Sequence, residues 1–477
     1  MHAPVRDQLG DFVAKADYES LPEGVLHESK RLVLDSIGCA LAAGDHTKGR
    51  IGVEFADILG GGDSSATVIG STKRSSVFGA AFANGELINA LDFDAILPPG
   101  HVSPYVLPGL LAIAEVDRAS GRDVLLAVAI AHELSNRFGK AMDSIRHTEG
   151  DSVAMPPILG YTSTVFGATA GIVRLRRANA DVTAQALSIA ASTTPVNSHR
   201  SWLEHTPVST IKYTMAGPIS QVALTAAFMA FLGHRGDPGV FDDPEFGYPR
   251  FIGSSRWEPE NLTSGLGVNW NFHRENSFKH YPHCRALHGL LDLEAEILKS
   301  NKIKPTEIQA IRAWGEGHVE RASWLTNEIS HPVDGQFSIA HGLAVGAQGI
   351  QPSKAWQSEE VVYDDDVLGL MDKVTYTRHP EWISLMSTDP HARPSRLEID
   401  AHGRTYSAEL MYPKGTPTQV GGMGTSDAEL IAKFRLNAQG ILPPETADKI
   451  VDCIMNLESI DDASKVLRLL GSPLPSA

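Results

Sequence analysis

The sequence predicts a mainly α-helical protein, in which a large all-helical domain is joined by a smaller α+β domain inserted before the C-terminal helices. Apolar residues recur at helical spacing from about residue 20 to residue 233, with little strand signal. Alternation typical of strands begins only after about residue 288, and helical spacing returns after residue 427. A chain of 477 residues also exceeds what one hydrophobic core organises, so two domains are expected.

The helical domain is predicted to comprise residues 1–274 and to be completed by residues 420–477, with residues 275–419 forming the α+β domain. Its first helix is expected after Ser20-Leu21-Pro22-Glu23, a capping-box pattern with proline in the first turn. Later periodic runs predict further helices at 76–90, 105–119, 121–142, 162–177, 183–192 and 217–232. Small residues crowd these runs, so the helices are expected to pack closely in a buried bundle.

The α+β domain is predicted to combine helices and strands. The helices are expected at 288–299 and 338–345, and the strands at 308–314, 373–377, 396–401 and 405–412. His402-Gly403 joins the last two strands, which is typical of a β-hairpin. A glycine-rich loop at 420–424 then precedes helices at 427–437 and 446–457, which are expected to return to the helical domain. The triplet Gly60-Gly61-Gly62 lacks the Lys-Ser/Thr of a phosphate loop and predicts a surface turn.

Composition narrows the class of protein. The formal net charge of -16 disfavours nucleic-acid binding, because phosphate recognition needs a basic face. No apolar run reaches the roughly 18 to 20 residues that span a bilayer, and the start of the chain lacks a signal peptide's apolar core. Cys39, Cys284 and Cys453 are far apart and odd in number, which fits a reducing compartment. We expect a cytoplasmic protein with no nucleic acid and no membrane as partners.

The stretch from Leu91 to Pro104 holds the strongest chemical signal. Two acids, Asp92 and Asp94, end a helix-like run, and His101 follows a Pro-Pro-Gly breaker at the head of the next run. A carboxylate and an imidazole in one loop can orient each other for proton transfer. The same residues are also ordinary loop chemistry, and Ser103 or His101 could simply cap the next helix. Both interpretations stay open on spacing alone.

Three other segments place polar residues where apolar ones are expected. Lys212 opens an apolar helix, where the helix dipole disfavours a cation, so it either binds a substrate carboxylate or extends to water. The 278–288 cluster indicates an interdomain anion site; a metal site at His280 and His283, with Cys284, lacks further ligands at zinc spacing. Glu133 and Arg137, one helical turn apart, are expected to pair structurally. His199, Arg200 and His205 are weaker candidates for a pocket wall, or are solvated.

At these residues the chain resembles the MmgE/PrpD family, over nearly its whole length. The resemblance implies that the α+β domain is a lid on the helical domain. It also implies a homodimer that acts on small di- and tricarboxylic acids and needs no metal or organic cofactor. Asp92 and His101 match the family's acid and histidine motif, Lys212 its lysine, and His288 the histidine after a Tyr-Pro-x-Cys turn. These four are the expected catalytic residues. The expected substrate-binding residues are Lys279, His283, Arg285, Arg200 and Thr162.

The chain also departs from the family pattern. Ala95 and Val102 replace an aspartate and a proline of the first motif, and Thr162 and Met215 stand where the family has histidines. Two imidazoles are therefore missing from the expected pocket. A tricarboxylate with all of the family's contacts is disfavoured, and a less charged or more apolar substrate is favoured.

The resulting hypothesis is a cofactor-independent lyase, a dehydratase, hydratase or decarboxylase of a small di- or tricarboxylic acid. Lys212, with Arg285 or Arg200, would hold a carboxylate and stabilise charge as a proton leaves. His101, oriented by Asp92, would transfer a proton at carbon, and His288 would act as an acid from the lid. Closure of the lid would exclude water. The alternatives are an epimerase or other isomerase of a small dicarboxylate, and a non-catalytic carboxylate-binding homologue.

Overall fold

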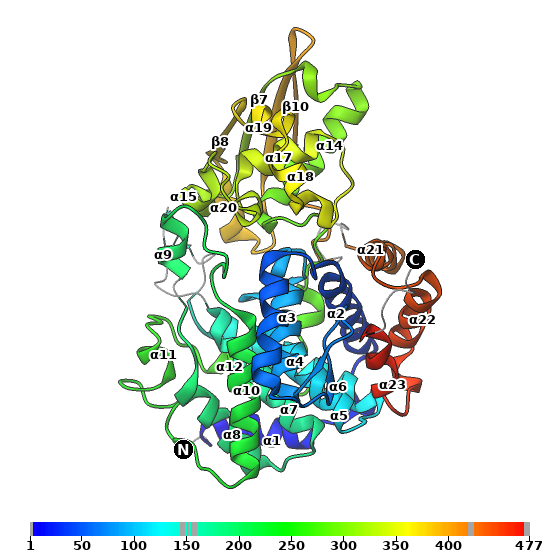
Figure 1. Cartoon of the computed structure of the whole chain (residues 1–477). Helices are drawn as coiled ribbons and strands as arrows, with labels where there is room; N and C mark the ends of the chain where they lie inside the picture. The colour runs from blue at the N-terminus through cyan, green and yellow to red at the C-terminus, as the bar shows by residue number, and fades with distance from the viewer. Residues whose placement is uncertain are drawn as a thin grey trace.

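The computed structural model describes residues 3–143, 148–149, 152–153, 160–197, 199–417 and 424–471. A large body of helices carries a smaller α+β part on one end, and the C-terminal helices lie beside helix α2 of the large body (Figure 1). The predicted fold class is therefore confirmed. The exact division of the chain at residues 275 and 420 stays a prediction. No helix among the described residues is both long enough and apolar enough to cross a bilayer.

The helical part is built mainly from long helices, which match the predicted runs except at 5–15 and 47–60, where no helix was predicted. These are α1 (Val5–Lys15), α2 (Glu23–Ala42), α3 (Thr47–Gly60), α4 (Val77–Ala90), α5 (Ser103–Val116), α6 (Gly121–Ala141), α7 (Thr164–Leu175), α8 (Ala180–Thr193) and α10 (Ala216–Phe231). Small residues bring them close together: a Cβ at Gly167 of α7 would lie 2.1 Å from the Ala131 carbonyl oxygen of α6. Glycine at this position is what lets the two backbones meet.

Short elements complete the helical part. The helices are α9 (His199–Glu204), α11 (Tyr248–Phe251), α12 (Glu260–Thr263) and α13 (Phe272–Glu275), and the short hairpins are β1 (Ala66–Thr67) with β2 (Arg74–Ser75), β3 (Ile96–Leu97) with β4 (Gly100–His101), and β5 (Thr148–Glu149) with β6 (Ser152–Val153). Gly61 adopts a left-handed backbone after α3, and the triplet that contains it is a surface turn, as predicted.

The capping box predicted at Ser20 is wrong. Ser20 ends a short 3-10 turn, η1 (Tyr18–Ser20), and its hydroxyl donates to the Asp17 carbonyl instead of capping α2. Pro22 is the N-cap of α2 and provides no side-chain cap. Helix α2 begins at Glu23, two residues later than the box requires, so Ser20 lies too far ahead of the helix to cap it.

The α+β part contains a four-stranded sheet in the order β10-β9-β7-β8. The strands β7 (Ile308–Gly315), β8 (Val374–Arg378), β9 (Ser395–Ala401) and β10 (Arg404–Leu410) match the predicted runs. β7 pairs with β8 in parallel and with β9 antiparallel. His402 and Gly403 both have positive φ, at 54° and 72°, and form the tight turn of the predicted β9–β10 hairpin.

Helices cover this sheet and join it to the rest of the molecule. They are α14 (His288–Asn301), α15 (Ala322–Leu325), α16 (Pro332–Gly335), α17 (Ile339–Ala347), α18 (Glu359–Val362), α19 (Asp365–Met371) and α20 (Trp382–Thr388). α14 packs against β9 and β10. A Cβ at Gly289 would lie 2.3 Å from the Ser395 hydroxyl, so glycine allows this close approach of helix and sheet.

The chain then returns to the helical part through α21 (Asp427–Ala438), α22 (Pro444–Met455) and α23 (Ser464–Leu467). A capping box between Ser426 and Glu429 starts α21. α21 packs along α2, where Lys433 forms an ion pair with Asp35 at 2.7 Å. Most of the predicted glycine-rich loop, residues 420–423, lies outside the described residues.

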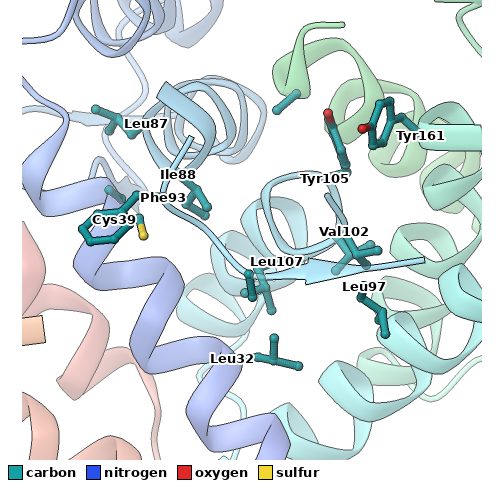
Figure 2. Close-up of a cluster of buried hydrophobic side chains, with 14 of the residues drawn as sticks. Leu32, Cys39, Leu87, Ile88, Phe93, Leu97, Val102, Tyr105, Leu107 and Tyr161 are labelled. Atoms are coloured by element: carbon teal, nitrogen blue, oxygen red, sulfur yellow. The ribbon is translucent and has the colours of Figure 1, made fainter. Parts of the chain in front are cut away.

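A buried apolar cluster fixes the segment between α4 and α5 (Figure 2). Phe93 and Leu97 of this segment belong to the same buried cluster as Cys39 and Leu32 of α2 (Figure 2). Phe93, Leu97 and Cys39 are each at most 1% exposed. Burial of these apolar side chains anchors the loop, so the polar residues interspersed with them have little freedom to move.

Candidate functional site

The loop between α4 and α5 brings two carboxylates to one imidazole. The β3–β4 hairpin turns the chain back, so that His101 faces the residues at the end of α4. Nδ1 of His101 donates to Asp94 Oδ2 at 2.7 Å, and its Nε2 lies 3.4 Å from Asp92 Oδ1. The prediction included Asp92 but not Asp94, which makes the shorter contact and fixes the tautomer of the ring. All three side chains are buried.

Asp92 also lies between two lysines. Lys279 Nζ is 2.5 Å from Asp92 Oδ2 and donates to the Asp92 carbonyl at 2.8 Å, and Lys212 Nζ is 3.4 Å from Oδ1. Burial by itself raises the pKa of Asp92, but the two ammonium groups outweigh it and hold that pKa well below its ordinary value. Asp92 is therefore a carboxylate at neutral pH.

Two of these residues have strained backbones. Asp92 and Lys212 adopt left-handed conformations, with φ of 52° and 57°. Such conformations cost roughly 1 to 3 kcal/mol in non-glycine residues and cluster at functional sites. The network between their side chains holds both residues in these conformations.

The structure corrects the expectation for Lys212. It lies in a turn before α10, which begins at Ala216, so it does not open the helix. It is 1% exposed, and its Nζ donates to the Asn89 carbonyl at 2.6 Å, so the solvated interpretation is wrong. Burial lowers the pKa of Lys212 to about 8, against the opposing effect of the Asp92 carboxylate.

We expect activity to fall as pH rises through about 8, because a neutral Lys212 no longer offsets the charge of Asp92. The measurement is kcat/KM between pH 6 and 10, and Lys212→Met should remove this alkaline limb as well as lower the plateau. An unchanged limb in Lys212→Met would contradict the assignment.

The stability of the fold should change with pH in the opposite direction from activity. Between about pH 8 and about 10.5, Lys212 binds more protons in the unfolded chain than in the folded protein. The cost of burying its charge is therefore relieved as the pH rises, and the free energy of unfolding increases.

The acid and imidazole cluster forms part of the wall of a cavity of about 630 Å³. Asp92, His101, Lys279 and Arg285 are the predicted site residues that line it. Its other walls come from both parts of the molecule. The helical part contributes Tyr161, His199, Trp202 and Tyr213, and the α+β part contributes His318, Trp324, Phe337, His391 and Arg393.

His288, a predicted catalytic residue, lies behind this wall. Its Nδ1 accepts from Arg285 at 3.1 Å and its Nε2 donates to the His283 carbonyl at 3.2 Å. Burial, together with the charges of Arg285 and Lys279, holds the pKa of His288 well below its ordinary value. The imidazole is thus neutral, has both nitrogens engaged, and supports Arg285, which is itself a cavity residue.

Three predicted substrate-binding residues also lie outside the described cavity lining. His283 is buried, and its Nε2 donates to the Ser338 carbonyl at 3.2 Å. Thr162 is fully buried next to Tyr161, and Arg200 is exposed on α9. The neighbour of Arg200, His199, lines the cavity instead. Successive side chains of a helix point about 100° apart, so His199 can face the cavity while the adjacent Arg200 faces solvent.

Lys433 is a residue that the sequence did not single out for function. From α21 its Nζ donates to Asp35 at 2.7 Å, to the Phe93 carbonyl at 2.7 Å and to the Lys279 carbonyl at 3.0 Å. It therefore ties α21 to α2, to the acid loop and to the segment that carries Lys279. Only the tertiary structure reveals this, because the partners lie up to 398 residues away in sequence.

The remaining polar candidates are structural. Arg137 Nε donates to Glu133 Oε1 at 2.7 Å, and both are buried, which confirms their predicted pairing. His280 Nε2 lies 2.9 Å from the Thr425 hydroxyl, so His280 and His283 bind different partners. Within the described parts of the chain, one group has metal-ligand proximity, His379 with Glu381 and Glu409, and none of its members lines the cavity. The absence of a metal or cofactor stays a prediction.

The fold and the site together define a class, a mainly helical protein with an α+β part. Both parts line its cavity, and a buried Asp–His–Asp cluster in the wall has the ammonium groups of two lysines beside it. The family model of the MmgE/PrpD N-terminal domain matches residues 7–260, and that of the MmgE/PrpD C-terminal domain matches residues 281–459. The chain belongs to the MmgE/PrpD family.

Full-length relatives support this membership. The chain is 25% identical to a cis-aconitate decarboxylase of Homo sapiens over 95% of this chain and 92% of that one. It is 24% identical to the cis-aconitate decarboxylase-like protein oryM of Aspergillus oryzae, over 98% of each chain. A cis-aconitate decarboxylase of Aspergillus terreus is also 24% identical, over 96% of this chain and 94% of that one.

Proposed function

We propose that the protein is a lyase that acts, without a metal or organic cofactor, on a small carboxylic acid by proton transfer at carbon. The observation that carries the proposal is the Asp94–His101–Asp92 cluster in the cavity wall, with Lys279 and Lys212 beside it. The names of the relatives favour decarboxylation within this class. Dehydration needs the same proton transfer and is the closest alternative outcome.

In the proposed reaction, cationic groups of the wall bind the substrate carboxylates that are retained. Arg285 lines the cavity and is held by the Lys414 carbonyl at 2.7 Å and by His288. A carboxylate bound there would gain a charge-assisted hydrogen bond of the kind guanidinium groups form best. His288 then acts through Arg285 as a positioning residue, in place of the acid role expected for it.

Decarboxylation breaks the bond between a carboxylate and the adjacent carbon. The electron pair of that bond delocalises into the substrate's conjugated system, and carbon dioxide leaves. His101 delivers the proton that the carbon then needs, and regains one from water. Asp94 keeps the ring oriented through Nδ1, while Asp92 lies beside Nε2 and stabilises positive charge there.

The cavity walls come from both parts of the molecule, so a relative motion of the α+β part would open and close the site. This lid role and the division at residues 275 and 420 are part of the proposal. So are a homodimeric assembly and a cytoplasmic location.

The test is incubation of the pure protein in deuterated water with citrate-like, aconitate-like, tartrate-like and amino-dicarboxylate compounds, followed by NMR. Loss of carbon dioxide with deuterium at the newly protonated carbon is the expected result. New alkene signals would show dehydration, and exchange at an α-carbon without net conversion would show epimerisation. No exchange with any compound would overturn the enzymatic proposal and favour a carboxylate-binding role. Activity should survive a chelator.

A further inference from the structure

The cavity carries little uncompensated charge. Five cationic and three carboxylate side chains line its described wall: Lys140, Arg256, Lys279, Arg285, Arg393, Asp92, Glu258 and Glu275. Four of the cations already form salt bridges, which are Lys140–Glu275, Arg256–Glu258, Lys279–Asp92 and Arg393–Glu316. A buried anion needs a partner to offset its desolvation. This wall is suited to one or two substrate carboxylates and is poorly suited to three.

One side of the same cavity is a continuous aromatic wall, formed by Tyr161, Tyr213, Trp202, Trp324 and Phe337. Tyr161 stacks on Tyr213 at a centroid distance of 4.5 Å, and Trp202 lies edge-on to Phe337 at 4.8 Å and to Trp324 at 5.6 Å. All five side chains are at most 8% exposed. The wall therefore presents apolar ring surface that gains free energy when it covers an apolar group.

This aromatic wall reaches the reacting imidazole. His101 stacks on Tyr213 with centroids 5.4 Å apart and an interplanar angle of 26°. A substrate whose carbon lies at His101 would therefore place its next substituent along the rings. The volume of about 630 Å³ leaves room for such a substituent, since pockets of roughly 300 to 1,000 Å³ hold ligands of drug size.

In the cavity lining, Nδ1 of His199 and Nε1 of Trp202 are among the buried polar atoms that have no hydrogen-bond partner in the described part of the chain. His199 is 3% exposed and Trp202 is 6% exposed. Buried polar groups are nearly always satisfied, and exceptions call for an explanation such as a ligand. Burial lowers the pKa of His199 to about 3, so the imidazole is neutral and offers a hydrogen bond without a charge.

We propose that the substrate is a mono- or dicarboxylic acid whose remaining arm is apolar and flat, bound along the wall of Tyr161, Tyr213, Trp202, Trp324 and Phe337. This deepens the proposed function and rests on it for the position of the reacting carbon. The charged end is bound by the cations near Asp92. Trp202 is the principal specificity determinant, because its ring contacts both Phe337 and Trp324 in the middle of the wall.

The test compares two matched acids on the full-length protein by titration calorimetry. Benzylidenesuccinate has a phenyl ring in place of the third carboxylate of aconitate, and the two acids otherwise share their carboxylates and alkene. We expect benzylidenesuccinate to bind at least about tenfold more tightly. Equal or tighter binding of aconitate would overturn the inference.

Trp202→Ala should weaken benzylidenesuccinate about tenfold or more and change aconitate binding less than about threefold. Trp202→Phe, which is gentler on folding, should give the same order with a smaller loss. The control is Trp270→Ala: Trp270 is also 6% exposed and its Nε1 also has no partner among the described residues, but it lies outside the cavity lining. Equal losses for both acids in the Trp202 variants would contradict a role in specificity.

The two proposals can fail separately. Binding of benzylidenesuccinate without deuterium incorporation from any acid would leave the binding inference standing and overturn the lyase. Turnover of aconitate with tighter binding than benzylidenesuccinate would leave the lyase standing and overturn the inference.

Discussion

His101→Ala is expected to lower the rate of deuterium incorporation at the substrate carbon by about 10² to 10⁴-fold, the usual contribution of a positioned general acid or base. His101 lines the cavity, and its Nδ1 donates to Asp94 at 2.7 Å, so it is the imidazole best placed to carry the proton. Binding of the acid, measured by calorimetry, should change far less than turnover. The measurement is NMR-detected exchange at saturating acid.

Two further variants sharpen this result. Asp94→Asn keeps the shape of the side chain but weakens the orientation of the ring, so we expect a smaller loss than for His101→Ala. His234→Ala, a change at an exposed histidine, should leave exchange unaffected. If His101→Ala retained wild-type exchange, the proton would be carried by another group and the proposed mechanism would be wrong.

Asp92→Asn is expected to destabilise the protein by about 3 to 5 kcal/mol, the usual cost of removing one partner from a buried ion pair. The change would leave Lys279 and Lys212 buried without a counter-charge, at positions where both are about 1% exposed. The strained backbone of Asp92 would also lose the side-chain interactions that hold it. Thermal unfolding at pH 7 should show a lower Tm, with exchange activity lost as well.

A double variant tests the physical reason. In Asp92→Asn/Lys279→Met the uncompensated ammonium is removed, so part of the lost stability should return while activity does not. Asp366→Asn, at an exposed aspartate, should change the Tm little. No recovery in the double variant would show that the loss comes from another cause.

The pH dependence of this contribution follows from the lowered pKa of Asp92. The carboxylate binds protons more weakly in the folded protein than in the unfolded chain, so its stabilising effect is complete above about pH 4. It is lost as the pH falls below that value. Acid unfolding of the wild-type protein should therefore approach that of Asp92→Asn at low pH.

Local patterns in the sequence predicted most of the fold. Helical periodicity located α4, α6 and α14 to within two residues at each end, and the His402-Gly403 turn located the β9–β10 hairpin. Such patterns succeed because spacing and turn geometry depend on neighbouring residues. The capping box at Ser20 failed because α2 begins two residues later than the box requires, at Glu23, and the Ser20 hydroxyl donates to the Asp17 carbonyl.

The site was predicted less completely than the fold, as particular residues show. The sequence and its family resemblance placed Asp92, His101 and Lys279 together with Arg285, and the structure brings these to one cavity. They could not show that His288 supports Arg285 from behind. Nor could they show which of two adjacent residues on α9 faces inward.

The sequence by itself determined the helical body with its α+β part, and the acid and imidazole loop between two helices. The tertiary structure decided that Asp94 accepts a hydrogen bond from His101 and that Lys433 of α21 donates one to the acid loop. It also decided that Trp202 and its neighbours form an aromatic wall. These depend on contacts between segments far apart in the chain. Which side chains meet there follows from how whole helices and sheets pack, and local spacing carries little information about that packing.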